Sequence, residues 1–229
     1  MRDLREIDEE RCRLLARFQE KMRATPSLAD PSPQGTGEKN RHGMPKEPPD
    51  QNVFEQSEWP VLDLGLTPET TTERWELHLD GAVEAPQNLR FADLLALPQI
   101  KVEADFHCVT GWSILDLMLG GVPFAWIAAL ARPRPDATHV MAHGSDGYSA
   151  NLPLEEALKP DVLLVHSIAD SPLTLPHGGP VRMVVPQLWA WKGAKWLNRI
   201  EFLTHDRRGY WEIRGYSNTA YPWRNDRQW

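Results

Sequence analysis

Cys108 is the first side chain whose surroundings suit chemistry. It ends an alternating segment, 100–108, and Gly111 shortly after it permits a sharp turn. Strand ends that face loops often carry functional side chains, and a thiolate is both a nucleophile and a soft metal ligand. A free cysteine is also often a buried, inert core residue, so both interpretations stand on this pattern alone.

Two later segments combine glycine with cationic side chains. In 177–182, His177 and Arg182 flank a Gly-Gly-Pro turn, where backbone N–H groups can approach an anion and arginine offers a planar fork for phosphate. In 189–196, two lysines alternate with three tryptophans around Gly193, a combination of point charge and flat rings that suits a planar anionic ligand. The plain alternatives are a hairpin with a solvated arginine and an exposed basic turn.

Among the other histidines, His143 lies after a predicted strand and before the turn Asp-Gly-Tyr. A thiol hydrolase with Cys108 as nucleophile and His143 or His107 as base is one interpretation. His107, however, is adjacent to Cys108 and points to the opposite face of a strand. The nucleotide-binding, zinc-protease and serine-hydrolase motifs are absent from the sequence.

The elements that must position these residues are short. Alternating or apolar runs predict strands, and 3.6-residue periodicity predicts helices. In 100–108, Ile100, Val102, Ala104, Phe106 and Cys108 share one face of a half-buried strand, and Lys101, Glu103, Asp105 and His107 share the other, exposed face. The other predicted strands are 75–80, 139–142, 162–168, 181–185 and 196–203, and the predicted helices are 91–97, 114–119 and 123–131. Short strands with scattered helices indicate an α+β fold with mixed sheets.

Composition narrows the class of protein. The chain has 229 residues, a formal net charge of −7 and two cysteines, Cys12 and Cys108, which excludes a disulfide framework and argues against general nucleic-acid binding. No apolar run approaches the roughly 20 residues of a membrane span, and no secretory signal is visible at the start. We therefore expect a cytoplasmic protein.

Residues 1–50 differ from the rest of the chain. Apolar residues at helical intervals predict an amphipathic helix over 2–23, which either docks on a partner or packs on its own domain. The stretch that follows, up to residue 50, is rich in proline, glycine and charge and is predicted to be a flexible linker. Residues 51–229 are predicted to form the functional domain.

Taken together, segments 105–113, 177–182 and 191–196 resemble the sulfite oxidase-like molybdopterin-binding family, in its branch of small bacterial oxidoreductases related to the catalytic subunit of protein-methionine-sulfoxide reductase. The resemblance covers about 59–229 and includes Trp59-Pro60-Val61-Leu62, Asp146-Gly147-Tyr148 and Gly209-Tyr210-Trp211. It implies a molybdenum-molybdopterin cofactor with Cys108 as the thiolate ligand of the metal. It also implies cofactor contacts at His177, Arg182, Gly193, Ala194, Lys195, His143 and Trp59.

The resemblance implies a mononuclear molybdenum oxidoreductase that transfers an oxygen atom to or from a small sulfoxide- or sulfite-like substrate. Electrons would be exchanged with a separate electron-transfer protein. Cys108 is followed by Val-Thr-Gly-Trp, whereas animal and plant sulfite oxidases have Ala-Gly-Asn-Arg there, so a sulfite site is not implied. A non-catalytic molybdopterin carrier is an alternative, because a fold does not fix a function.

Overall fold

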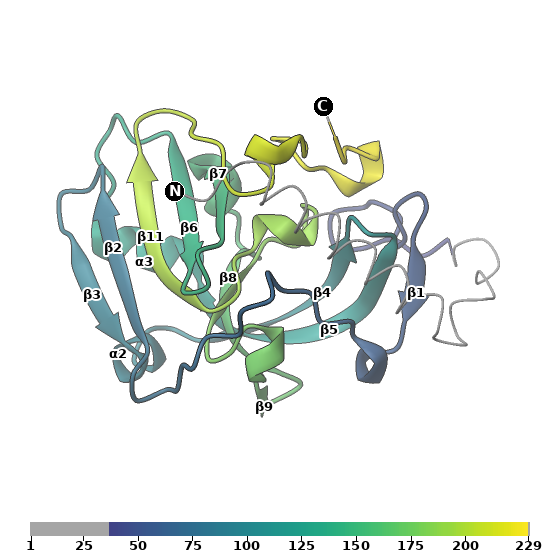
Figure 1. Ribbon diagram of the computed structural model, residues 1–229, viewed down its shortest axis with the longest axis horizontal. Coiled ribbons are helices and arrows are strands. Elements are labelled where there is room, and N and C mark those ends of the chain that lie inside the picture. Colours follow the sequence, from purple (N-terminus) through teal and green to yellow (C-terminus); the bar gives the residue numbers. More distant parts are fainter. Residues whose placement is uncertain (1–36, 229) are drawn as a thin grey trace.

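Two mixed β-sheets form the framework of the protein (Figure 1). The computed structural model describes residues 37–228. The six-stranded sheet has the order β1-β5-β8-β10, with β4 also paired to β5 and β9 to β8, and the five-stranded sheet has the order β3-β2-β11-β6-β7. The α+β class with mixed sheets is confirmed. The strands are β1 (Asn52–Phe54), β2 (Glu76–Gly81), β3 (Gln87–Arg90), β4 (Ile100–Cys108), β5 (Trp112–Pro123), β6 (His139–Gly144), β7 (Ser149–Pro153), β8 (Leu163–Ile168), β9 (Ser171–Pro172), β10 (Arg182–Val184) and β11 (Leu197–Leu203).

Short helices are scattered between these strands. The α-helices are α2 (Phe91–Leu95), α3 (Phe124–Ala131) and α4 (Leu154–Ala157), and the 3₁₀ turns are η2 (Gln56–Glu58), η3 (Leu175–His177), η4 (Ala190–Lys192), η5 (Glu212–Arg214) and η6 (Pro222–Arg224). Helix α3 buries Phe124, Ile127 and Ala131, which recur at helical spacing, in the core of the five-stranded sheet. Among the described residues, no helix is long and apolar enough to cross a membrane.

The predicted strand over 100–108 is confirmed as β4, and the predicted helix over 123–131 as α3. The helix predicted over 114–119 is wrong, because these residues lie in the middle of β5. Leucine and methionine have high helix propensity, but β5 pairs with β1, β4 and β8, and such long-range pairing overrides a local preference. Strands β1, β3, β7 and β9 were not predicted.

Strand β4 departs from simple alternation in its second half. A β-bulge interrupts its pairing with β5 between Ala104 and Phe106, and Asp105 and His107, predicted on the exposed face, are buried. Asp105 Oδ1 accepts the backbone N–H of Asp116 at 3.0 Å, and Asp116 has a positive φ of 55°. The carboxylate thus satisfies a backbone donor that the irregular ladder leaves free.

Part of the predicted linker packs on the body of the protein. His42 Nε2 lies 2.6 Å from the buried Asp161 Oδ2, Lys46 forms an ion pair with Asp116, and Trp223 Nε1 donates to the Pro45 carbonyl at 2.6 Å. The described residues 37–50 therefore lie beside the C-terminal segment and the β4–β5 hairpin (Figure 1). The helix predicted over 2–23 lies outside the described residues.

Gly121 marks a close approach between β5 and β8. A Cβ atom at this position would collide with the backbone carbonyl of Leu164. We expect Gly121→Ala to lower the free energy of unfolding by about 2–3 kcal/mol, measured by urea denaturation. Gly120→Ala is the matched control: its Cβ would meet the Ser167 hydroxyl, a side-chain group that can rotate away, so we expect a smaller loss. An equal loss in both variants would contradict this explanation.

Candidate functional site

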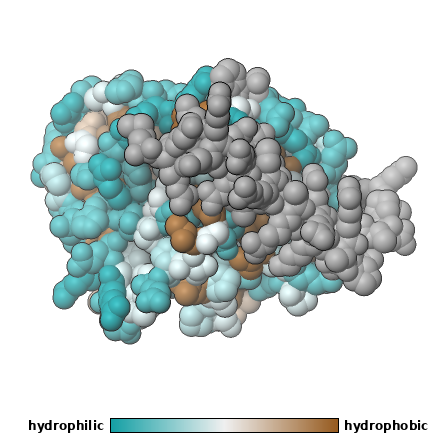
Figure 2. Space-filling view, viewed as in Figure 1, coloured by the Kyte–Doolittle hydropathy of each residue, from teal (hydrophilic) through white to brown (hydrophobic). Residues whose placement is uncertain are grey.

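A single large pocket collects residues from six separate stretches of the chain. Its empty space is about 1020 Å³, open solvent at its mouth included. The lining residues come from 59–64, 106–112, 146–148, 176–182, 190–195 and 211–216. The segment before β2, dark blue in Figure 1, crosses the middle of the molecule between the two sheets. Figure 2 shows hydrophobic residues reaching the surface in the middle of this same face.

Cys108, the last residue of β4, lines this pocket. Phe106, on the same face of the strand, lines it too, as the parity of 100–108 predicts. The Sγ atom lies 3.0 Å from the Thr110 hydroxyl. Burial raises the pKa of the Cys108 thiol, and the hydrogen bond from Thr110 and the positive charges of Arg227 and Arg182 act against that rise. A thiol in this position is deprotonated most readily when a metal cation binds the sulfur and displaces its proton.

A metal at Cys108 would need further ligands from a cofactor. Over residues 37–228, no group of three or more His, Cys, Asp or Glu side chains is placed to hold a metal ion. A soft thiolate selects a soft metal. The donor set therefore fits a metal that arrives with its own sulfur chelate and takes one more sulfur from the protein.

Arg182 brings a buried positive charge to the pocket. Only 4% of the residue is exposed, and burial lowers the pKa of its guanidinium to about 10. Nη1 donates to the His177 carbonyl at 2.9 Å, the guanidinium carbon lies 4.9 Å from the centre of the Phe106 ring, and Nε is buried without a hydrogen-bond partner. Within the described part of the chain, no carboxylate forms an ion pair with Arg182. Such a charge suits an anionic ligand.

Lys195 lies in the same pocket. Its Nζ donates to the carbonyls of Leu62 at 2.8 Å and Pro176 at 2.7 Å. Burial and, to a lesser extent, the charge of Arg182 lower the pKa of Lys195 to about 7, although Asp63 and Asp146 act in the opposite direction. Two cations that repel one another in a mostly apolar pocket form a site for a group with more than one negative charge.

His177 and Trp59 form the adjoining wall. The imidazole stacks on the indole with ring centres 4.5 Å apart. Its Nε2 lies 3.3 Å from the Trp59 carbonyl and its Nδ1 lies 2.9 Å from the Thr174 hydroxyl, so the proton belongs on Nε2. Burial lowers the pKa of His177, which keeps the ring neutral. The wall therefore offers flat apolar surface beside the two cations.

Of the remaining predicted site residues, one lines the pocket and two do not. Gly193 lines the pocket, and a Cβ there would collide with the Met183 carbonyl, so only glycine fits. Ala194 is fully buried behind this wall, where its carbonyl accepts the Met183 N–H at 2.9 Å. His143 lies outside the pocket on β6, with Nε2 3.2 Å from Glu201. A cofactor contact by His143 is therefore not supported.

His107 also lies outside the pocket. Its Nδ1 is 2.8 Å from the Ser113 hydroxyl, which donates to Gln51 at 3.0 Å, and burial lowers the pKa of the imidazole to about 3. It is a neutral structural histidine. Neither His107 nor His143 is therefore placed as a base for Cys108, and the thiol-hydrolase interpretation loses its support.

Several lining residues were not predicted as site residues. They are Leu62, Asp63 and Leu64 before β2, Asp146 before β7, and Trp211 and Tyr216 near the C-terminus. Most of them lie within or beside short stretches that carry the family resemblance, and this resemblance is the sequence signal that could have identified them. Burial raises the pKa of both Asp146 and Tyr148.

The fold and this pocket define a molybdopterin-binding oxidoreductase. Residues 64–211 match the family described as "Oxidoreductase molybdopterin binding domain", and the chain belongs to this family. The cofactor of the family is molybdenum-molybdopterin, and the predicted family and cofactor are confirmed.

Two curated relatives and one solved structure are similar to this chain. An uncharacterized oxidoreductase of Bacillus subtilis, YuiH, is 41% identical over 182 residues, covering 79% of this chain and 90% of the relative. The protein-methionine-sulfoxide reductase catalytic subunit MsrP of Gluconobacter oxydans is 32% identical over 60% of this chain, which spans about half (49%) of that protein. The crystal structure of the sulfane dehydrogenase SoxCD from Paracoccus pantotrophus superposes with a TM-score of 0.59 at 22% identity, over 63% of this chain and 42% of that one, and shows a shared fold.

Proposed function

We propose that this protein is a mononuclear molybdenum enzyme that catalyses two-electron oxygen-atom transfer on a small sulfoxide- or sulfite-like substrate. The observation that carries the proposal is the convergence of the Cys108 thiol with two cations, the buried Arg182 and the partly buried Lys195, in one pocket. For a sulfoxide, the balanced reaction takes two electrons and two protons and gives a thioether and water. A separate electron-transfer protein supplies the electrons, and we place the protein in the cytoplasm.

Six of the residues that line the pocket have a defined role in this proposal. Cys108 supplies the thiolate ligand of the metal. Arg182 and Lys195 neutralise the phosphate of the pterin, while His177, Trp59 and Gly193 provide the wall against which the cofactor lies. When bound, molybdenum-molybdopterin supplies the two-electron chemistry, and the protein supplies orientation, charge and exclusion of water. The apolar lining around Cys108 excludes water from the reacting centre.

The proposal is tested by the metal and pterin content of the full-length chain. We expect protein from a molybdenum-replete host to contain molybdenum and pterin in equal amounts, close to the amount of chain, and to reduce a sulfoxide with an artificial electron donor. Protein from a host that cannot make molybdopterin is the control. Negligible molybdenum in both preparations would overturn the proposal. Bound pterin without turnover of any sulfoxide or sulfite would instead support the carrier alternative.

Lys195 gives the anion site a pH dependence. The protonated amine is the form that binds an anion, and the pKa of Lys195 is about 7 in the cofactor-free protein because of burial. Sulfate keeps a constant charge between pH 6 and pH 9 and is therefore a suitable probe. We expect its affinity to be highest below about pH 7 and to fall roughly tenfold per pH unit above it. Isothermal titration calorimetry of the cofactor-free protein measures this dependence and the accompanying uptake of a proton.

Lys195→Arg is the matched control, because arginine keeps its charge over this range. We expect a flat pH profile for this variant. A wild-type sulfate affinity independent of pH would contradict the assignment of Lys195.

The lowered pKa of Lys195 also affects folding. The folded-state pKa lies below the unfolded value, so the unfolded chain binds more protons between about pH 7 and 10.5. The cofactor-free protein therefore gains stability as the pH rises through this window.

A further inference from the structure

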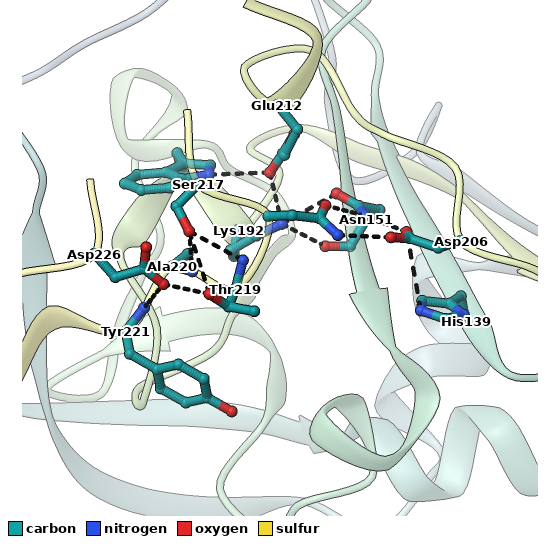
Figure 3. Close-up of polar contacts among 12 residues, drawn as sticks. His139, Asn151, Lys192, Asp206, Glu212, Ser217, Thr219, Ala220, Tyr221 and Asp226 are labelled. Atoms are coloured by element: carbon teal, nitrogen blue, oxygen red, sulfur yellow. Dashed lines mark hydrogen bonds and ion pairs between the residues drawn. The ribbon is translucent and has the colours of Figure 1, made fainter. Parts of the chain in front are cut away.

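Behind the pocket wall lies a fully buried ion pair between Lys192 and Glu212. Their Nζ and Oε1 atoms are 2.7 Å apart, and the two side chains are 1% and 0% exposed. Asn151 accepts from the same Nζ through its backbone carbonyl and its side-chain oxygen, each at 3.0 Å. Figure 3 shows Lys192 between Glu212 and Asn151. The ammonium group therefore has three acceptors, all from the protein.

Stability does not explain this pair. Desolvating two charges costs free energy that their attraction often fails to recover, and well-packed apolar side chains of similar volume serve a core equally well. One oxygen of Glu212, Oε2, is buried without a hydrogen-bond partner, which adds to the cost. A buried pair with such a cost is more readily explained by what it orients than by what it stabilises.

The pair holds two residues that line the pocket. Glu212 Oε1 also accepts the indole N–H of Trp191 at 3.0 Å, and the Trp191 carbonyl accepts the hydroxyl of Tyr148. Trp191 and Tyr148 both line the pocket, as do Gly193 and Trp211, the chain neighbours of Lys192 and Glu212. The ion pair thus ties η4, β7 and η5 together on the side of the wall that faces away from the pocket.

The outer side of the pair is fixed as well. Asn151 Nδ2 donates to Asp206 Oδ1 at 2.7 Å and to Asn218 Oδ1 at 2.8 Å, and Asn218 donates to Asp206 at 2.6 Å. His139 lies 3.9 Å from Asp206 near the surface (Figure 3). This network fixes the amide orientation of Asn151, so its side-chain oxygen stays aimed at Lys192.

We propose that Glu212 is a positioning residue, which sets the orientation of the Trp191 ring and of the neighbouring Gly193 backbone against the cofactor, while Lys192 neutralises its buried charge. The inference rests on the proposed function, because it assigns these wall residues to a molybdopterin pocket. It adds a residue that touches neither the cofactor nor the substrate. The group that carries the effect is the indole N–H of Trp191, which Glu212 holds in one direction.

Two double variants separate positioning from packing. Lys192→Met with Glu212→Gln removes both charges but keeps an oxygen that accepts the Trp191 N–H. Lys192→Met with Glu212→Leu removes the charges and that acceptor. In full-length protein from a molybdenum-replete host, we expect the glutamine variant to retain molybdenum within about twofold of wild type. We expect at least about a tenfold loss of molybdenum or of kcat/KM in the leucine variant, as for residues that orient metal ligands, with a shifted tryptophan emission.

Ile127→Ala is the matched control for stability, because Ile127 is fully buried in α3 and does not line the pocket. Molybdenum in the leucine variant equal to wild type, or lost only as much as in Ile127→Ala at the same unfolding temperature, would overturn the inference. If the leucine variant fails to fold, Trp191→Phe tests the same hydrogen bond without touching the ion pair: a comparable loss of molybdenum supports the inference, and wild-type molybdenum content overturns it. Wild-type protein without molybdenum would instead reject the proposed function.

Discussion

Cys108→Ser is expected to lower sulfoxide reduction at least about 100-fold, because it removes the only sulfur that the described residues lining this pocket offer to a metal. Changes to residues that merely orient a metal ligand cost about 10- to 100-fold, so loss of the ligand itself must cost at least as much. The pterin should remain in part, because Arg182 and Lys195 are unchanged. Steady-state kinetics with an artificial donor, together with metal and pterin analysis, measure both quantities.

Thr110→Val is the matched control for Cys108→Ser. Thr110 lies 3.0 Å from Cys108 Sγ, so its replacement removes the hydrogen bond near the sulfur without removing the sulfur. We expect a far smaller loss of activity and unchanged molybdenum content. Wild-type turnover and wild-type molybdenum in Cys108→Ser would show that Cys108 is an inert core thiol.

Arg182→Met is expected to act in opposite directions on cofactor binding and on stability. The arginine carries a buried charge with one unpaired N–H, and an unsatisfied buried donor costs about 1–3 kcal/mol. The cofactor-free variant should therefore be more stable than cofactor-free wild type, by about 1 kcal/mol after the loss of the bond to the His177 carbonyl. Its affinity for the cofactor should fall about 10- to 100-fold, because charge-assisted hydrogen bonds contribute about 1.5–3 kcal/mol.

Urea denaturation of protein from a host without molybdopterin measures the first effect, and retained molybdenum after dialysis measures the second. Arg199→Met is a suitable comparison, because Arg199 lies on β11 outside the pocket and pairs with Asp80 at 2.9 Å. We expect that variant to keep its molybdenum. A cofactor-free Arg182→Met that is clearly less stable than wild type would show that Arg182 serves the fold rather than the ligand.

Local sequence patterns predicted those elements in which the alternation of buried and exposed residues is regular along most of the element. The alternation of 100–108 gave β4 and the face on which Cys108 lies. The same reasoning misplaced 114–119, because an apolar run of leucines carries no information about the partners that pair with it. It also placed Asp105 on the exposed face, since a β-bulge depends on the neighbouring strand and leaves no periodic signal.

The pocket was predictable in its centre and less so at its edges. Cys108, His177, Arg182, Gly193, Lys195 and Trp59 were predicted from glycine, charge and aromatic patterns and from the family resemblance, and all of them line one pocket. His143 was expected after a strand but lies within β6, and its side chain contacts Glu201 rather than the pocket. The segment 60–64 is irregular and apolar, and its place in the wall depends on contacts with distant parts of the chain, such as the bond from Lys195 to Leu62.

The pocket wall is built from six distant stretches of chain, so a bound cofactor affects the stability of the fold as well as catalysis. A ligand seated among them joins residues near 59 to residues near 216, and it can do so only in the native state. Tight binding to that state alone raises resistance to unfolding by mass action, by about 4 kcal/mol at a thousandfold excess over Kd. When molybdenum is scarce, cofactor-free protein would unfold more often and would be degraded by proteases before the cofactor-bound form.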